Sequence, residues 1–502
     1  MKSIFDIFSV SDLFILIVYL SVILVITIYF TRSFGVSSLE YFLARKSVNW
    51  MVMGFSIFIA AASSEYFLWM FSLKKMTGCN IFYLFFIFFL MAFVSVKFFL
   101  PKYLSLNIHT TPEYIEKRFD RKSSIYLTWL SLVFFILIKI VLALSVSSVF
   151  LQEIFKAEAI NTLLFLVLLT GVLTLVGGLS AVIHIHLLQA VVLIIGTLYF
   201  SFAGNNIIEF NNFFNFIDSS ITRGAGNNSI GFYSVLFVLP CFAIFSVWFW
   251  SEDQFVLQRI FSVRNFRQAS KGILLGLLLI LSFAFLFFNN ILVSGGEPAQ
   301  LISGNMTGSI TMRHLYEGEK SLLLIGIYSF LMASLASIFH SGAALFTYNS
   351  YRYLNPDTSD SKLVLVGRLA TTTFVVITLL LVPAIKLFTY ELFLYIFGIM
   401  MILISPIVAV LLMSAVYKEN NKRIAFRTLL INGILGLVLI ITSPGAKSNS
   451  SGAGFLFHWN FFDFSVILFL LSCLIIGISN YLSNGKRKFS TAEGPDFSGS
   501  ND

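Results

Sequence analysis

Residues 50–66 read Trp50-Met-Val-Met-Gly-Phe-Ser-Ile-Phe-Ile-Ala-Ala-Ala-Ser-Ser-Glu-Tyr66, an apolar stretch that ends in two hydroxyls and a carboxylate. Extended to 49–73, it reaches the roughly 20 residues that a spanning helix needs. Close helix packing would explain its alanines but not Glu65, because an ionisable group at bilayer depth usually marks a pathway or a buried partner. The stretch therefore predicts a functional, interrupted membrane helix.

Similar apolar stretches fill most of the 502-residue chain. With 58% hydrophobic and 11% charged residues, such a chain cannot coat a soluble globule. We therefore predict an all-α integral membrane protein with about 13 transmembrane helices, formed as one transporter domain over residues 1–483 and followed by a disordered cytoplasmic tail over 484–502. The predicted spans are 11–31, 49–73, 79–100, 123–152, 160–177, 181–203, 231–251, 271–294, 320–350, 363–385, 389–415, 423–443 and 460–483.

The distribution of basic residues predicts the orientation in the membrane. With the N-terminus outside, cytoplasmic segments hold 22 of the 33 Lys and Arg residues and outer segments hold nine, while Lys97 and Lys139 lie within spans. Because Lys and Arg resist translocation, this asymmetry predicts a multi-pass cell-membrane protein with the N-terminus outside and the C-terminus cytoplasmic. The bases are scattered over short loops, which excludes a nucleic-acid partner. Lipid and a small solute are the expected partners, and both a monomer and a homodimer stay open.

Other function classes are excluded by missing motifs. The chain has no phosphate-binding loop and no soluble domain large enough for an ATPase, so primary pumping is not expected. Its three cysteines, Cys79, Cys241 and Cys473, lack the spacing of a metal site or a disulfide framework. We expect no enzyme, no cofactor and no metal beyond a transported ion, which leaves a channel, a receptor or a secondary transporter.

Five motifs that follow one another along the chain resemble those of the sodium:solute symporter family, which includes the sodium/glucose, proline and sialic acid cotransporters. The seventh span carries the most specific match. The motifs are Glu40-Tyr-Phe-Leu-Ala-Arg-Lys46 with Trp50, Thr111-Pro-Glu-Tyr-Ile-Glu-Lys-Arg-Phe119, Gly177-Gly178-Leu-Ser-Ala-Val182 with Gln189, Trp250-Ser-Glu-Asp253-Gln254-Phe-Val-Leu-Gln258-Arg259, and Ser405-Pro406.

The resemblance implies a five-plus-five inverted-repeat core of the leucine-transporter type, with repeats at about 49–203 and 231–415. Broken second and seventh spans would enclose a midplane site, and alternating access would couple a small organic solute to sodium. Hard cations prefer oxygen ligands, and the family pattern implies the backbone of Ile59 and Ala62 with the hydroxyls of Ser334 and Ser337.

The chain departs from the family pattern around this ion site. Ala333 replaces a serine, His340 replaces an asparagine, and Ile185-His186 replaces a threonine and an aspartate. Because histidine titrates near neutrality, one alternative is a proton-coupled symporter that uses His186 or His340, although both could be packing histidines. A transport-inactive solute sensor and a uniporter are further alternatives.

Candidates for the central cavity are Glu65, Tyr66, Lys139, Asp253 and Gln254. Lys139 has about a dozen mainly apolar residues on each side, too far for snorkelling, so Glu65 is its expected partner. Lys139 could instead be the counter-charge of an anionic solute. Tyr66 replaces a glutamine of the sugar-carrying members, so a sugar is one of several possible substrates.

The polar end of span 7 is predicted to form a gate or a structural motif. Asp253 and Arg259 are six residues apart, about 9 Å along a helix, which excludes a pair within one turn. We expect Trp250, Gln258 and Arg259 to tie this end to a neighbouring element, although a solvated helix end explains the pattern equally well. Gly177 and Gly178 are assigned to the same structural role.

Overall fold

Helices form every regular element in the part of the chain that the computed structural model describes, which is residues 9–33, 37–62, 81–155, 159–203, 234–293, 319–387, 390–417, 422–442 and 461–490. The first repeat and its flanks contain α1 (Val10–Ser33), α2 (Ser38–Leu43), η2 (Ala44–Lys46), α3 (Trp50–Ala62), α5 (Ile81–Phe98), α6 (Leu100–Ser105), α7 (Thr111–Arg118), α8 (Arg121–Phe134), η3 (Phe135–Ile140), α9 (Val141–Phe155) and α10 (Ala159–Ala203).

The second half contains η5 (Ser234–Val238), α13 (Leu239–Ser251), α14 (Gln254–Ile260), α15 (Phe266–Val293), α17 (Glu319–Leu345), η7 (Phe346–Tyr351), α18 (Arg352–Leu354), α19 (Asp360–Leu381), η8 (Pro383–Leu387), α20 (Tyr390–Val416), α21 (Ile424–Thr442) and α22 (Phe461–Ser490). Each predicted span coincides with one of these helices or with a run of them, apart from the stretches outside the described residues. The all-helical fold class is confirmed.

The described helices do not correspond one to one with the predicted membrane crossings. Nine of the described helices are long and apolar enough to span a bilayer, and the bent pair α13–α14 makes a tenth. Reaching the predicted thirteen requires α10 to cross twice and the short apolar helices α3 and α21 to cross once each. Thirteen therefore stays a prediction.

Gly178 divides α10 into the two predicted spans 160–177 and 181–203. Its φ of 60° and ψ of −168° are non-helical within an assigned 45-residue helix. A Cβ at this position would lie 3.0 Å from the backbone oxygen of Tyr41. Only glycine adopts this backbone without strain, so Gly178 accounts for the kink between the two segments of α10.

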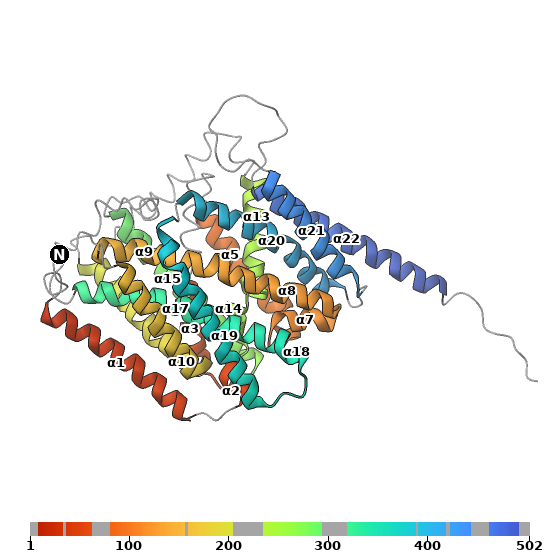
Figure 1. Cartoon of the computed structure of the whole chain (residues 1–502). Helices are drawn as coiled ribbons and strands as arrows, with labels where there is room; N and C mark the ends of the chain where they lie inside the picture. The colour runs from red at the N-terminus through yellow and green to blue at the C-terminus, as the bar shows by residue number, and fades with distance from the viewer. Residues whose placement is uncertain are drawn as a thin grey trace, which may run out of the picture.

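The two predicted repeats exchange partners in space. The first helix of the first repeat, α3, packs against α15, the second helix of the second repeat. In return α13, which begins the second repeat, packs against α5, the second helix of the first repeat. This reciprocal packing is what an inverted repeat produces, and it places the broken seventh span at the centre of the molecule (Figure 1).

Small residues allow α3 and α15 to approach closely. A Cβ on Gly54 would lie 2.8 Å from the backbone oxygen of Gly272, and a Cβ on Gly272 would lie 2.7 Å from that of Trp50. Small residues at such crossings are typical of membrane helices, where packing rather than water exclusion holds helices together. The α3–α15 contact therefore fixes the position of the helix that carries Ile59 and Ala62.

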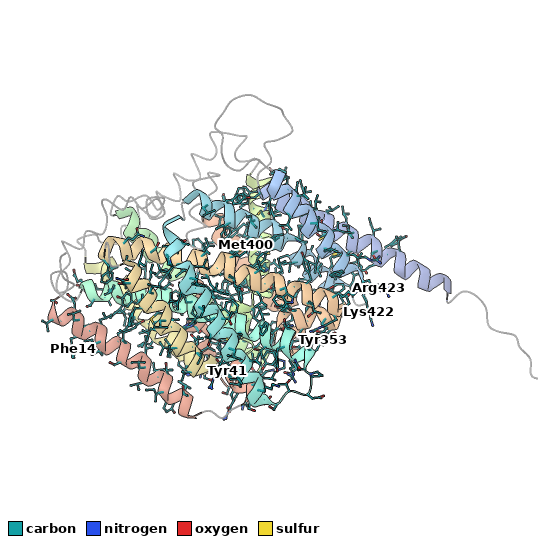
Figure 2. The ribbon with its side chains drawn as sticks, in the orientation of Figure 1. Phe14, Tyr41, Tyr353, Met400, Lys422 and Arg423 are labelled. Atoms are coloured by element: carbon teal, nitrogen blue, oxygen red, sulfur yellow. The ribbon has the colours of Figure 1, made fainter. Side chains whose placement is uncertain are left out.

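The outer surface is apolar, as expected of a protein in lipid. Phe14 on α1 is 66% exposed, whereas Met400 in α20 is fully buried, and both are labelled in Figure 2. Figure 1 shows α1 at one edge of the bundle and α22 at the opposite edge, where α22 packs on α20 and α21. Helix α22 continues to Ser490, into the predicted disordered tail, and 491–502 lie outside the described residues.

We predict that Gly272→Ala destabilises the protein by about 1–3 kcal/mol, because the added methyl overpacks the α3–α15 contact. Thermal unfolding of the detergent-purified protein measures the change. Gly326→Ala is the matched control, since a Cβ there meets only Leu193, at 4.0 Å. Equal unfolding temperatures for both variants would contradict the close approach of α3 and α15.

Candidate functional site

The seventh predicted span is broken where α13 meets α14. The segments Val235–Ser251 and Gln254–Ile260 are bent by 42° relative to each other, with Glu252 and Asp253 between them. Asp253 caps the second segment, because its Oδ1 accepts a hydrogen bond from the backbone N–H of Phe255 at 3.1 Å. A capping carboxylate satisfies an amide that a helix N-terminus leaves unpaired. The break is therefore encoded locally by Asp253.

Lys139 balances the charge of Asp253. Its Nζ lies 2.5 Å from Oδ2 of Asp253, and the two side chains are 2% and 0% exposed. Lys139 lies in the π-helical segment η3, and the rings of Phe135, Trp248 and Phe255 surround its Nζ at 4.5–5.3 Å from their centroids. Because an uncompensated buried charge is costly, this pair ties span 4 to the break in span 7.

Glu65 was predicted to be the partner of Lys139. Glu65 and Tyr66 lie outside the described residues, so their roles in the cavity stay predictions. The charge balance that motivated the pairing is supplied by Asp253. The expectation that Asp253 and Arg259 do not pair within one helical turn is confirmed, since the two side chains bond to different partners.

The segment before α7 clamps the break. The side-chain Oε1 of Gln254 accepts from the backbone N–H of Thr111 at 3.3 Å, and its Nε2 donates to the backbone oxygen of His109 at 3.1 Å. The hydroxyl of Thr111 donates to the backbone oxygen of Glu252 at 2.9 Å. Gln254, predicted as a cavity residue, thus has its amide engaged within the protein, and its contact with solute stays a prediction.

A carboxylate outside the spans orders this clamp. The Oε2 of Glu113 accepts from the backbone N–H of His109 at 2.8 Å, and its Oε1 lies 3.2 Å from Nζ of Lys117. Burial alone would raise the pKa of Glu113, but the hydrogen bonds from His109 and Lys117 outweigh it and lower this pKa to about 2. Glu113 therefore stays ionised at physiological pH.

Gln258 and His340 form a second polar tie across the core. Nε2 of Gln258 donates to the backbone oxygen of Phe42 at 3.0 Å and lies 2.9 Å from Nδ1 of His340. Nε2 of His340 donates to the backbone oxygen of Tyr41 at 3.0 Å, which leaves its Nδ1 as the acceptor. Ser341 completes the tie by donating to Oε1 of Gln258 at 2.9 Å. Both ring nitrogens of His340 are therefore engaged, as in a packing histidine.

Arg259 extends from α14 into the centre of the bundle and is 1% exposed. Its Nε donates to Oγ of Ser56 at 2.9 Å, and its Nη2 donates to Oγ of Ser337 and to Nδ1 of His186, the latter at 3.3 Å. Its Nη1 donates to the backbone oxygen of Phe255. The guanidinium therefore joins α14 to α3, α10 and α17, while a gating role for Arg259 stays a prediction.

His186 faces a small cavity on its other side. Its Nδ1 accepts from Arg259, so the ring proton belongs on Nε2. That Nε2 has no hydrogen-bond partner among the described residues. It borders a cavity of about 10 Å³ that Gln189, Thr174 and Met332 also line, which is space for about one water molecule.

The predicted cation ligands lie on α3 and α17, two helices that contact each other. Ile59 and Ala62 are fully buried in the last described turn of α3. Ser334 is 1% exposed, and within the described ranges no group hydrogen-bonds to its Oγ. The hydroxyl of Ser337, in contrast, donates to the backbone oxygen of Ala333 at 2.5 Å. Of these two serines one turn apart, Ser334 therefore has a hydroxyl available for a ligand and Ser337 does not.

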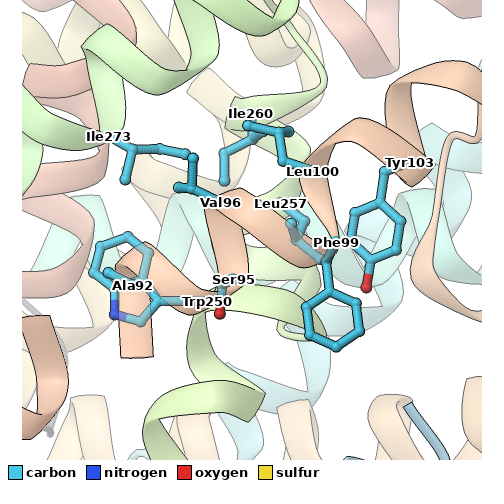
Figure 3. A pocket seen from close by; sticks show the side chains of 10 residues that line it. All are labelled: Ala92, Ser95, Val96, Phe99, Leu100, Tyr103, Trp250, Leu257, Ile260 and Ile273. Atoms are coloured by element: carbon cyan, nitrogen blue, oxygen red, sulfur yellow. The ribbon is translucent and has the colours of Figure 1, made fainter. Parts of the chain in front are cut away.

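Trp250 borders another small cavity, between α5, α6, α13, α14 and α15 (Figure 3). Its ring packs against the rings of Phe88 and Phe249, with centroids 5.3 and 5.1 Å apart. Beside it, Ser251 donates to Ser95 at 2.7 Å. The cavity volume is about 10 Å³, so Trp250 has the packing of a structural residue rather than the wall of an open path.

The Sodium:solute symporter family model matches residues 41–432, which is most of the chain. The chain belongs to this family. The protein is therefore a multi-pass membrane transporter and not an enzyme, and its function is sodium-coupled symport of a small solute.

Curated relatives and a solved structure extend the family match. The chain is 26% identical to "Sodium/myo-inositol cotransporter 2" of Sus scrofa over 474 residues and 27% identical to its Homo sapiens counterpart over 475, covering 86% of this chain and 70% of each relative. A Na+-coupled sialic acid symporter has a similar fold, with a TM-score of 0.73, 18% identity, and coverage of 94% of this chain and 97% of that one.

Sequence reasoning missed two residues of this symporter's central cluster. Ser56 was quoted in the second span but not assigned, although a hydroxyl among apolar residues often marks a polar neighbour. Glu252 precedes Asp253 in the most specific motif, and it is 3% exposed at the break. Its position between two helical segments was a usable signal, because break residues in these folds lie near the transport path.

We predict that Lys139→Met and Asp253→Asn each destabilise this symporter by about 3–5 kcal/mol, because each leaves one buried charge without its partner. Denaturant unfolding in detergent measures the free energy of unfolding. The double variant is expected to lose less than the sum of the two, since it removes both charges.

Lys97→Met is the control, because Lys97 also lies in a membrane helix but is exposed. A strictly additive double variant would show that Lys139 and Asp253 do not act as a pair.

Proposed function

We propose that this symporter couples one sodium ion, bound between α3 and Ser334 of α17, to the uptake of a small neutral polyol across the cell membrane. The N-terminus lies outside and the C-terminus in the cytoplasm. Family membership gives the class of transport, and the residues of the core support the finer assignment of ion, ligand and solute.

The main support for a sodium site is the hydroxyl of Ser334, which has no hydrogen-bond partner among the described residues. A buried hydroxyl without a partner costs roughly 1–3 kcal/mol, which a bound cation would offset. Sodium prefers oxygen ligands, and the backbone oxygens of Ile59 and Ala62 on the packed α3 complete such a set. Ser337 is left out of this set, because its hydroxyl is engaged by Arg259 and Ala333. The predicted four ligands thus reduce to three.

The two histidines do not support proton coupling. His340 has both ring nitrogens in hydrogen bonds, to Gln258 and Tyr41. His186 accepts a hydrogen bond from the guanidinium of Arg259, and a second positive charge on this ring would be repelled. Sodium is therefore the preferred coupling ion.

The pairing of Lys139 with Asp253 supports a neutral solute. Lys139 was considered as the counter-charge of an anionic solute, but Asp253 already pairs with it at 2.5 Å. The relatives are named for myo-inositol, a small uncharged polyol, which makes myo-inositol the first substrate to test. A polyol offers hydroxyls to polar groups without needing an opposite charge.

We predict that Ser334→Ala raises the sodium concentration for half-maximal myo-inositol uptake by about tenfold or more, because it removes one ion ligand worth about 1.4 kcal/mol. Ser337→Ala, the same change one turn away, is expected not to raise this concentration, because the hydroxyl of Ser337 is bonded to Arg259 and is not an ion ligand. Uptake into proteoliposomes at varied sodium measures both.

A larger effect from Ser337→Ala than from Ser334→Ala would contradict the assigned ligand set. Uptake that needs no ion gradient would instead support the uniporter, and stabilisation by myo-inositol without any uptake would support the sensor.

We also predict that myo-inositol causes no alkalinisation outside proteoliposomes when potassium replaces sodium, because neither histidine is placed to carry a proton. A pH-sensitive dye measures the proton flux, and an added protonophore is the control for dye response. Solute-driven alkalinisation that His186→Ala or His340→Ala abolishes would establish proton coupling instead.

A further inference from the structure

Among the described residues, the side-chain groups that contact the buried guanidinium of Arg259 are neutral. Its side-chain partners are the hydroxyls of Ser56 and Ser337 and the Nδ1 of His186. In the described part of the chain, Arg259 takes part in no ion pair. Hydroxyl and imidazole lone pairs solvate this charge without cancelling it.

The nearest carboxylate along the helix does not cancel the charge by contact. Asp253 lies six residues before Arg259 and bonds to Nζ of Lys139 at 2.5 Å. An arginine keeps its charge under nearly all conditions, even when buried. A permanent positive charge therefore lies among α3, α10, α14 and α17, and two of these helices, α3 and α17, carry the proposed sodium ligands.

Ser337 places that charge close to the proposed sodium ligand. Ser334 and Ser337 are three residues apart on α17, which is about 4.5 Å of helix rise. Positive charges held beside two positions one helical turn apart repel each other across a protein interior, where screening is weak. The guanidinium bonded to Ser337 is thus positioned to oppose a cation at Ser334.

We propose that Arg259 is a tethered cation that sets the sodium affinity of this symporter by charge repulsion across Ser337. His186 contributes to this repulsion, because its neutral ring accepts a hydrogen bond from the guanidinium but does not cancel the positive charge of Arg259. The inference rests on the proposed sodium position at Ser334. Weak binding would favour release of the ion on the low-sodium side of the membrane.

Two variants remove the repulsion in different ways. Arg259→Gln deletes the charge, and His186→Asp places a carboxylate beside it. Both are expected to lower the sodium concentration that half-maximally stabilises the full-length protein by about tenfold or more. Thermal unfolding in sodium against potassium at matched ionic strength measures this in detergent, without requiring transport.

Tighter sodium binding is a result that general damage to the fold does not produce. Arg259→Lys keeps a charge, so its half-maximal sodium concentration should stay above that of Arg259→Gln. Arg368→Gln is the matched control, because it deletes an exposed charge on α19. Unchanged or weaker sodium binding in both His186→Asp and Arg259→Gln would overturn the proposal, and if only one variant folds, its result alone decides.

Failure of this inference is distinguishable from failure of the proposed function. A wild-type response to sodium that Ser334→Ala abolishes, with no gain in either neutralised variant, would leave the sodium site and remove the tethered cation. Absence of any sodium response in the wild type and in both neutralised variants would remove the proposed site itself.

Discussion

The rest of the core depends on the buried ion pair between Lys139 and Asp253. A carboxylate with no exposed surface needs a cation, and Lys139 reaches it from the middle of span 4. The same carboxylate caps α14, so one side chain both breaks span 7 and binds the break to another helix. The geometry of the broken span is therefore set by charge balance as much as by backbone preference.

This pairing determines what the neighbouring charge can do. With Asp253 occupied by Lys139, Arg259 turns to the other side of α14 and contacts neutral groups on three further helices. The reciprocal packing of α3 with α15 and of α13 with α5 holds those helices in place. Two buried cations, Lys139 on η3 and Arg259 on α14, thus have distinct roles, one in building the break and one beside the proposed ion site.

The length of the apolar stretches was enough to predict the helices, because a chain in lipid must satisfy every backbone polar group by internal hydrogen bonds. The division of α10 near Gly178 was also predicted, as the boundary between spans 160–177 and 181–203. Side-chain partners were not. Lys139 needed an acidic partner, and only Glu65 was expected from the sequence, whereas the three-dimensional structure brings Asp253 to 2.5 Å. Nothing in the sequence distinguishes Ser334 from Ser337. In the structure, Arg259 donates to the hydroxyl of Ser337, whereas that of Ser334 has no partner among the described residues.

The departures from the family pattern form a consistent network rather than scattered losses. His340 is bonded through both ring nitrogens, and His186 accepts from a guanidinium that also engages Ser337. The substitutions at these positions therefore fit one another physically, as expected of a working symporter in which the surroundings of the ion have been retuned.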